Sequence, residues 1–360
     1  MTAPFSLGAH WPAAPGRRRV LLHCGLHKTG SSALQYFFCF AAGLLRARGI
    51  LYPVTGRPPA VRNAQHNIAW QLAGDARFDP RAGTVDDLAA EIGAFPGDAI
   101  VSSEDFESLL ETPERLAPLL RHPALRGHAF TLLIYLRDQA SYLEALFPEL
   151  LRHDLTITPA EMYDRIIARG ALRDAARVFQ FDYAALLARL RRLTGAEVAL
   201  RAYDRLEGGT LVFDIIAYAG LGIVIVEGDA RQRINPRPPL ESTLGSFCGP
   251  PVRKLLAMPR IRALLKGRRA SLSPALRARL AARFAGGNRS VEQAAGWPAG
   301  SLHIDPRIPS DALVMEHLFT PELRARLTAL AGQDLNAATV EATLATLAAA
   351  LPPGATPLVA

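Results

Sequence analysis

The chain has 360 residues, of which 49% are hydrophobic and 21% are charged, so its composition is that of a folded globular protein and excludes a disordered or fibrous one. Its 41 lysines and arginines outnumber its 33 acidic residues, and the formal net charge of +8 favours anionic partners such as nucleotides, acidic glycans and lipid headgroups without choosing among them. The three cysteines, Cys24, Cys39 and Cys248, are an odd number without metal-ligand spacing, which argues against a disulfide framework and against a zinc site.

Residues 1–18 lack the basic start and apolar stretch of a signal peptide, and we expect them to form a flexible leader. No later segment approaches about 18 uninterrupted apolar residues, the length that a membrane-spanning helix needs. We therefore predict a cytoplasmic protein without a transmembrane segment.

The first predicted elements are a strand and a helix. A short apolar run from Val20 to Cys24, followed by a glycine, predicts a strand that is buried on both faces. Downstream, apolar residues recur at helical spacing and predict one amphipathic helix. Ser32 and Gln35 have the spacing of a capping box, so we expect this helix to begin close to Gly30. The apolar positions of the helix are Leu34, Phe37, Phe38, Ala41, Leu44 and Leu45.

The loop between this strand and helix points at a helix N-terminus, where unpaired N–H groups and the helix dipole favour an anion. Lys28 adds a full positive charge, Gly30 lets the backbone approach closely, and Thr29, Ser31 and Ser32 add hydroxyl groups. Lys28 is one of only three lysines in an arginine-rich chain, which indicates that the loop needs a compact ammonium group. The loop is therefore a candidate phosphate site; the alternative is a surface lysine in a polar turn.

A brief second strand is predicted at residues 49–53, followed by an irregular loop over residues 54–64. His66 then stands at the start of a predicted helix that continues to about residue 73. This histidine is either a base near an acceptor molecule or a polar residue in the first turn of a helix.

A helix pattern at residues 85–92 leads to a buried strand at residues 98–105, whose carboxyl end carries Glu104 and Asp105. In open parallel sheets, ligands bind beyond the carboxyl ends of the strands. We therefore expect Glu104 to lie at the same edge of the sheet as Lys28.

The next strand is predicted at residues 129–136 and is followed at once by Arg137, so this arginine also emerges at the carboxyl end of a strand. A helix follows over residues 143–151, and we expect Pro148 to kink or shorten it.

Further along, residues 183–193 predict a helix, residues 197–203 a strand and residues 211–222 another helix. Strands that alternate with helices indicate a parallel β-sheet with helices on both faces. The expected fold class is α/β, in the form of a P-loop NTPase-like three-layer sandwich with a largely helical C-terminal part.

We expect residues 19–227 to form the α/β core that holds a cofactor site. Residues 228–360 form a mainly helical extension, which we expect to pack on the core and to contribute to an acceptor site. Within it, an arginine-rich helical stretch over residues 253–284 is predicted to end before Gly286 and Gly287.

The order of residues in the first loop separates two classes of phosphate site. A nucleotide-triphosphatase P-loop reads G-x-x-x-x-G-K-[ST], whereas Lys28 here stands two residues before Gly30. The sequence Lys-Thr-Gly-Ser-Ser after a first strand, with strands that end at Glu104 and Arg137, resembles bacterial-type sulfotransferases that use 3′-phosphoadenylyl sulfate (PAPS).

This resemblance implies a PAPS cofactor, no metal, and transfer of a sulfuryl group to a hydroxyl or amine of a glycan, lipid or small metabolite, with no nucleic acid among the partners. It implies that Lys28, with the backbone of residues 29–32, holds the 5′-phosphate and stabilises the leaving group. His27 belongs to the same loop and is expected to face this phosphate. Neither the acceptor nor the oligomeric state follows from the sequence.

The family clamps the 3′-phosphate with an arginine after a strand and a serine eight residues later. Arg137 matches the first position, but Ala145 stands at the second, so Ser141 is the candidate replacement. The alternative for Arg137 is an ion pair with Asp138 or Glu144.

A general base must lie within hydrogen-bond reach of the acceptor hydroxyl. Glu104 is the first candidate, His66 the second and His27 the third. The alternative for Glu104 is a structural ion pair with Arg137. A weaker part of the resemblance is Asn235, in a segment that folds over the nucleotide in family members.

Two other functions stay open. One is a phosphoryl-transfer enzyme, a kinase or NTPase, in which Glu104 and Asp105 hold Mg²⁺; it requires a lysine after the last loop glycine. The other is a protein that binds a nucleotide or an acidic glycan without turnover.

Overall fold

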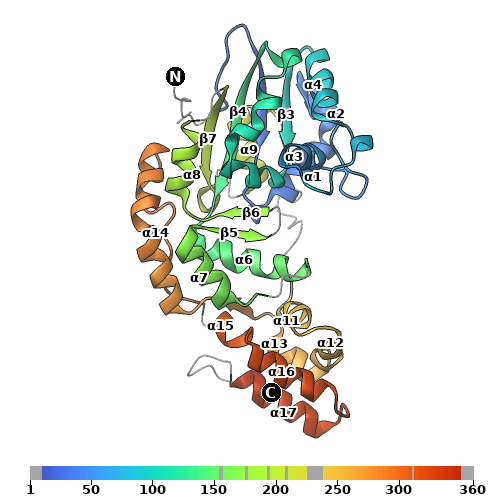
Figure 1. Cartoon of the computed structure of the whole chain (residues 1–360), viewed down its shortest axis with the longest axis vertical. Coiled ribbons are helices and arrows are strands. Elements are labelled where there is room, and N and C mark those ends of the chain that lie inside the picture. Colours follow the sequence, from blue (N-terminus) through green and yellow to red (C-terminus); the bar gives the residue numbers. More distant parts are fainter. Residues whose placement is uncertain are drawn as a thin grey trace. The chain divides into compact units, whose positions relative to one another are not determined.

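The computed structural model describes residues 10–153, 157–174, 177–192, 195–206, 210–224, 238–309 and 312–349. The chain forms two compact units that alternate along the sequence (Figure 1). The first unit comprises Met1–Arg137, Gly170–Asn235 and Ala285–His303, and the second comprises Asp138–Arg169, Pro236–Phe284 and Ile304–Ala360. Residues 1–9 of the expected leader, and Asn235, lie outside the described residues, and the predicted division at residues 227/228 stays a prediction.

A five-stranded parallel sheet forms the centre of the first unit, which confirms the α/β class. The strand order is β2-β3-β1-β4-β7, and every neighbouring pair is parallel. In this order β1 lies between β3 and β4, so the loops that follow these three strands leave one edge of the sheet together. The strands are β1 (Arg18–His23), β2 (Ile50–Leu51), β3 (Asp98–Ser102), β4 (His128–Leu136) and β7 (Ala196–Ala202).

Both faces of this sheet are covered. On one face Leu21, Ile100 and Leu133 pack in a single apolar core with residues of α1, α2 and α9. On the other face the alternate strand residues, such as Val20 and Leu132, are also fully buried. A sheet that is buried on both sides reads as continuous apolar runs, as these strands do. The result is consistent with a three-layer sandwich.

Most helices of the first unit begin and end near their predicted limits. The helices are α1 (Ser31–Phe40), α2 (Ala42–Ala47), α3 (His66–Ala73), α4 (Val85–Ala94), α5 (Ala117–Leu120), α8 (Tyr183–Leu190) and α9 (Leu211–Ala219). A 3₁₀ segment, η2 (Glu104–Glu111), follows β3 directly. A short antiparallel hairpin of β5 (Ala171–Asp174) and β6 (Arg177–Gln180) was not predicted, because its two four-residue strands are too short to give a clear alternating pattern.

The first helix differs from its prediction in two ways. It is divided at Ala41 into α1 and α2, and the predicted capping box is wrong. Gly30, in a left-handed conformation, occupies the N-cap position without a side-chain cap, and Ser32 lies inside the helix. Gln35, which the capping box would have turned back to the N-terminus, donates a hydrogen bond to Glu104 instead. A tertiary partner therefore outweighs the local motif.

The prediction that a helix ends before Gly286 and Gly287 is also wrong, because α14 runs through both glycines from Pro274 to Ala294. A Cβ atom on Gly287 would lie 3.2 Å from the Cβ of Ala184 in α8. The missing side chain thus allows close packing there, and this offsets the helix propensity of about 1 kcal/mol that a glycine loses.

The second unit is mostly helical. Its α6 (Gln139–Arg152) passes through Pro148, so the proline does not shorten this helix as expected. The unit also contains a two-stranded parallel pair, β8 (Arg269–Ser271) and β9 (Ala312–Val314). The other helices are α7 (Pro159–Arg169), α11 (Leu240–Cys248), α12 (Pro250–Leu256), α13 (Pro259–Leu265), α15 (Met315–Leu318), α16 (Pro321–Ala331) and α17 (Ala337–Ala348).

Across the described ranges of both units, no helix combines the length and the apolar character that crossing a bilayer requires.

The approach to β3 provides a test of the packing. A Cβ atom on Gly97 would lie 2.1 Å from the backbone oxygen of Gly49, an atom that accepts the hydrogen bond of Asp98. We expect Gly97→Ala to lower the free energy of unfolding by about 1–3 kcal/mol, because the clash is with backbone. The matched control is Gly43→Ala in α2, where no atom lies within 4 Å and the alanine favours the helix. Urea unfolding of both variants measures this, and equal stability of the two would contradict the packing at Gly97.

Candidate functional site

The loop from Cys24 to Gly30 connects β1 to α1 and is fixed to β4. The backbone N–H groups of Cys24 and Leu26 donate to the carbonyls of Leu133 and Tyr135 at 2.9 and 3.3 Å, and Tyr135 donates back to Gly25 at 2.8 Å. The ladder of the sheet therefore continues into the loop, which holds its backbone in one conformation.

The loop also depends on left-handed backbone conformations. Gly25, Lys28 and Gly30 have φ values of 90°, 60° and 80°, and Lys28 is the exception because a side chain normally avoids this region. A Cβ atom on Gly25 would lie 3.1 Å from the Cα of Glu104. Gly25 thus permits the loop after β1 to approach the start of η2 closely.

Two of the hydroxyl groups expected to face a phosphate bond within the loop. The hydroxyl of Thr29 donates to the carbonyl of Leu26 at 2.6 Å, and the hydroxyl of Ser31 donates to the same carbonyl at 3.5 Å. Thr29 is fully buried. These side chains brace the loop, so the groups that remain for a ligand are mainly backbone donors.

Three adjacent backbone N–H groups, those of Thr29, Gly30 and Ser31, have no hydrogen-bond acceptor within the part of the chain that the structure describes. They stand at the start of α1, a helix of ten residues, where the helix dipole presents partial positive charge. Successive N–H groups in such a turn form a concave anion site. The predicted phosphate loop therefore has the donors that an anion needs.

Arg137 lies beside this loop. Its Nη1 donates to the carbonyl of Lys28 at 3.4 Å, and its guanidinium carbon lies 5.2 Å from the centre of the Tyr203 ring. Its Nε is buried and lacks a partner among the described residues. The alternative ion pair with Glu104 is not formed in the described part of this unit, and Glu144 is engaged by Arg277 and Ser271 instead. Arg137 is therefore available to an anionic ligand.

Ser141 belongs to the second unit and is the third residue of α6. Its backbone N–H donates to the side chain of Asp138, the N-cap residue, at 2.9 Å. Ala145 lies in the next turn of the same helix. The role of Ser141 in place of the expected serine stays a prediction.

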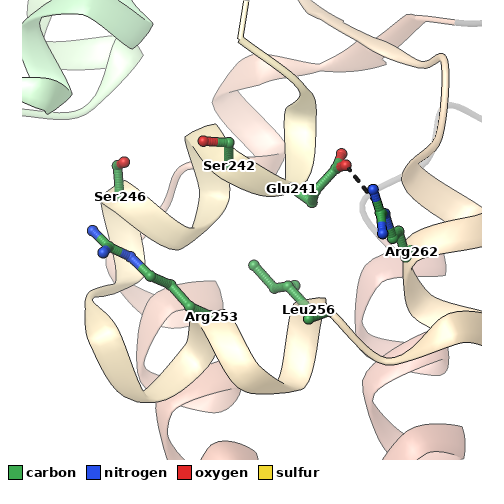
Figure 2. A pocket seen from close by; sticks show the side chains of 7 residues that line it. Glu241, Ser242, Ser246, Arg253, Leu256 and Arg262 are labelled. Atoms are coloured by element: carbon green, nitrogen blue, oxygen red, sulfur yellow. Dashed lines mark ion pairs between the residues drawn. The ribbon is translucent and has the colours of Figure 1, made fainter.

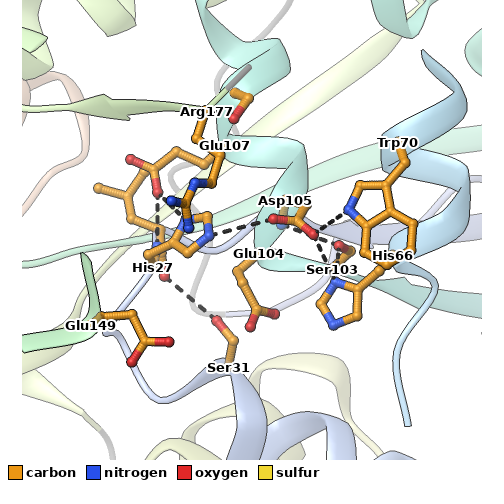
Figure 3. A network of polar contacts seen from close by, with 12 residues as sticks. His27, Ser31, His66, Trp70, Ser103, Glu104, Asp105, Glu107, Glu149 and Arg177 are labelled. Atoms are coloured by element: carbon orange, nitrogen blue, oxygen red, sulfur yellow. Dashed lines mark hydrogen bonds and ion pairs between the residues drawn. The ribbon is translucent and has the colours of Figure 1, made fainter. Parts of the chain in front are cut away.

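Glu104 is the first residue of η2 and is half-buried at the carboxyl edge of the sheet. The buried side-chain amide of Gln35 in α1 donates to its Oε2. Figure 3 shows this carboxylate between the loop that carries Ser31 and the segment that carries Ser103. The strand end and the helix after the loop together fix its position.

His27 is held between two carboxylates (Figure 3). Its backbone N–H and its ring Nδ1 donate to Glu107 Oε2 at 2.8 and 2.7 Å, and its Nε2 lies 3.5 Å from Asp105 Oδ1. Burial opposes the charged imidazolium, but the hydrogen bonds and negative charges of Asp105 and Glu107 outweigh it and raise the pKa of His27 to about 10. His27 is a fixed cation beside the loop at neutral pH.

Asp105 also binds the other candidate histidine. His66 Nδ1 lies 2.8 Å from the Ser103 hydroxyl and 3.3 Å from Asp105 Oδ2, and Trp70 Nε1 donates to the same carboxylate oxygen at 2.6 Å. Burial opposes the charge on His66, but Asp105 and then Glu104 raise its pKa above the ordinary value. Burial would raise the pKa of Asp105, yet the two histidines hold it well below its usual range.

The sequence indicated Glu104, Asp105 and both histidines but missed Gln35 and Glu107. Glu107 is fully buried and has only the signal of a third acidic residue after a buried strand. Gln35 was assigned to helix capping, so its tertiary role had no separate signal. Among the described residues, no group of three or more His, Cys, Asp or Glu side chains is arranged to hold a metal ion.

No family model matches this sequence, and searches of curated proteins and of solved structures find no similar chain. The function must therefore be inferred from the residues and their contacts.

The charge on His27 can be measured. Because its pKa in the folded protein is about 10 and that of an unfolded histidine about 6.5, the folded state binds the extra proton between these values. This contribution to stability is fully present below pH 6.5 and is lost as the pH rises through 10. We expect ¹⁵N NMR at pH 7 to show both His27 ring nitrogens protonated.

The matched control is His23, because burial lowers its pKa to about 4 and it should be neutral at pH 7. Glu107→Gln should lower the pKa of His27 and weaken the loss of stability between pH 6.5 and 10. A neutral His27 ring at pH 7 in the unmodified protein would contradict the assigned contacts.

Proposed function

We propose that this protein is a PAPS-dependent sulfotransferase of the P-loop-like class, which transfers a sulfuryl group to a hydroxyl or amine of an acceptor. The observation that carries the proposal is the group of three unpaired N–H donors at the start of α1, next to Lys28 and Arg137. The resemblance of the Lys-Thr-Gly-Ser-Ser loop to that family supports the same conclusion.

The residues fit the two phosphates of PAPS. The backbone N–H groups of residues 29–31, with Lys28, would hold the 5′-phosphate, because they combine helix-terminal donors with a full charge. Arg137 would hold the 3′-phosphate, since its guanidinium has a buried Nε without a partner in the described chain. When bound, PAPS supplies a sulfuryl group activated by an anhydride bond to the 5′-phosphate.

Lys28 and the loop N–H groups supply the main stabilisation of the transition state. Charge grows on the phosphate as the S–O bond breaks, and donors fixed in advance stabilise it without reorganising. One such donor is typically worth about 3 kcal/mol of barrier. The rigid attachment of the loop to β4 keeps these donors aligned.

Glu104 is the group best suited to accept the proton of the acceptor. His27 and His66 are poor general bases at neutral pH, because their raised pKa values favour the protonated forms. Their charges act instead through the field at the loop. Gln35 holds one oxygen of Glu104 and leaves the other for the acceptor.

The alternative of a phosphoryl-transfer enzyme has less support, since Lys28 precedes the last loop glycine and Asp105 is already engaged by His66 and Trp70. Incubation with radiolabelled PAPS and a panel of carbohydrate, lipid and small-metabolite acceptors tests the proposal. Transfer of label without added metal would support it. Consumption of ATP that depends on Mg²⁺ would contradict it.

Lys28→Ala should abolish transfer and weaken the binding of adenosine 3′,5′-bisphosphate by at least 10-fold, because the loop loses its full charge. Calorimetric titration measures the affinity. The matched control is Lys266→Ala, an exposed lysine outside the loop, which should bind normally. Wild-type affinity and rate in Lys28→Ala would refute the site.

Glu104→Gln should lower the rate of transfer by about 10²–10⁴-fold, the range for loss of a general base. It should leave the affinity for the bisphosphate within about twofold, since the amide keeps the shape of the side chain. Glu114→Gln, at an exposed site in the same unit, is the control for charge. An unchanged rate in Glu104→Gln would remove this residue from the mechanism.

A further inference from the structure

A second candidate site lies in the second unit, in a hollow formed by α11, α12 and α13 (Figure 2). Its volume is about 410 Å³, within the range of about 300–1,000 Å³ in which proteins hold small molecules. The residues that line it are Glu241, Ser242, Ser246, Arg253, Leu256, Ala257 and Arg262.

The hollow carries an excess of positive charge. Arg253 has no carboxylate partner in the described part of the second unit, and the nearest carboxylate to Arg262 is that of Glu241, at 3.9 Å. The sequence has no acidic residue between Glu241 and Glu292. One guanidinium is therefore left uncompensated, and a guanidinium presents several donors in a fork that matches a carboxylate or phosphate.

The position of Arg253 is fixed by packing. A Cβ atom on Gly245 would lie 3.0 Å from its Cγ, and its Nε lies 3.5 Å from the Gly245 carbonyl. The absence of a side chain at Gly245 lets the arginine stem lie against α11. Figure 2 shows its guanidinium on the same side of the hollow as Ser246.

Hydroxyl groups complete the polar lining. Ser242 and Ser246 stand one turn apart on α11, and neither side chain has a hydrogen-bond partner within the described ranges. On the opposite side Glu241 offers carboxylate oxygens, which accept hydrogen bonds from ligand hydroxyls. Leu256 and Ala257 provide a small apolar surface between them.

We propose that this hollow binds a small hydroxylated anion of the sugar-acid or sugar-phosphate kind. Arg253 and Ser246 hold the anionic group, Glu241 accepts hydrogen bonds from the ligand hydroxyls, and Leu256 contacts its carbon skeleton. A nucleotide is a poorer fit, because no aromatic side chain lines the hollow to stack on a base. The inference does not depend on the transfer reaction proposed for the first unit.

Titration of the full chain with glucuronate, glucose 6-phosphate, glucose and inorganic phosphate tests this, followed by NMR at the backbone amides of α11 and α12. Glucuronate or glucose 6-phosphate should shift these amides with millimolar or better affinity, and glucose should not. The two anions distinguish a carboxylate ligand from a phosphate ligand. Shifts by inorganic phosphate equal to those of glucose 6-phosphate would mean an adventitious ion only and would overturn the proposal.

Arg253→Gln should weaken this binding by at least 10-fold, and Ser246→Ala by a smaller factor. The matched control is Lys254→Gln, the exposed neighbour of Arg253 in α12 that does not line the hollow. Lys28→Ala should leave the shifts in α11 and α12 unchanged, which separates this site from the phosphate loop. Binding that survives in Arg253→Gln, or the absence of binding by both anions, would refute the assignment.

Discussion

The parallel pairing of β1 with both β3 and β4 is the interaction on which the candidate site depends. Its hydrogen bonds do not stop at the end of β1 but continue through Gly25 and Leu26 to Tyr135. The loop that follows is therefore set by the sheet. Glu104 follows the neighbour on one side and Arg137 the neighbour on the other, so three separate parts of the sequence meet at one edge.

A second constraint is the balance of buried charge next to this edge. Glu107 is fully buried and accepts hydrogen bonds from His27 and from the backbone of Gln180. A buried carboxylate is costly unless it is paired and hydrogen-bonded, and here each oxygen has a donor. Asp105 plays the same part between His27 and His66. The result is a set of cations whose positions are fixed before any ligand binds.

The two units offer different kinds of anion site. In the first, backbone donors at a helix start combine with Lys28, which suits a phosphate held close to the main chain. In the second, the donors are side chains, Arg253 with nearby serine hydroxyls, and the lining also includes an acceptor, Glu241. The first arrangement favours a compact, highly charged group, whereas the second favours a single charge on a hydroxylated ligand.

The sequence by itself determined the strands of the sheet, the loop after β1 and the edge at which Lys28, Glu104 and Arg137 emerge, because buried strands and their carboxyl ends leave clear local patterns. Only the tertiary structure decided which polar groups meet there. Gln35 bonds Glu104 instead of capping α1, Thr29 turns its hydroxyl into the loop, and α14 continues through Gly287 because α8 lies close to it. Each of these outcomes depends on a residue distant in the chain, and local propensities of about 1 kcal/mol or less are too weak to resist such contacts.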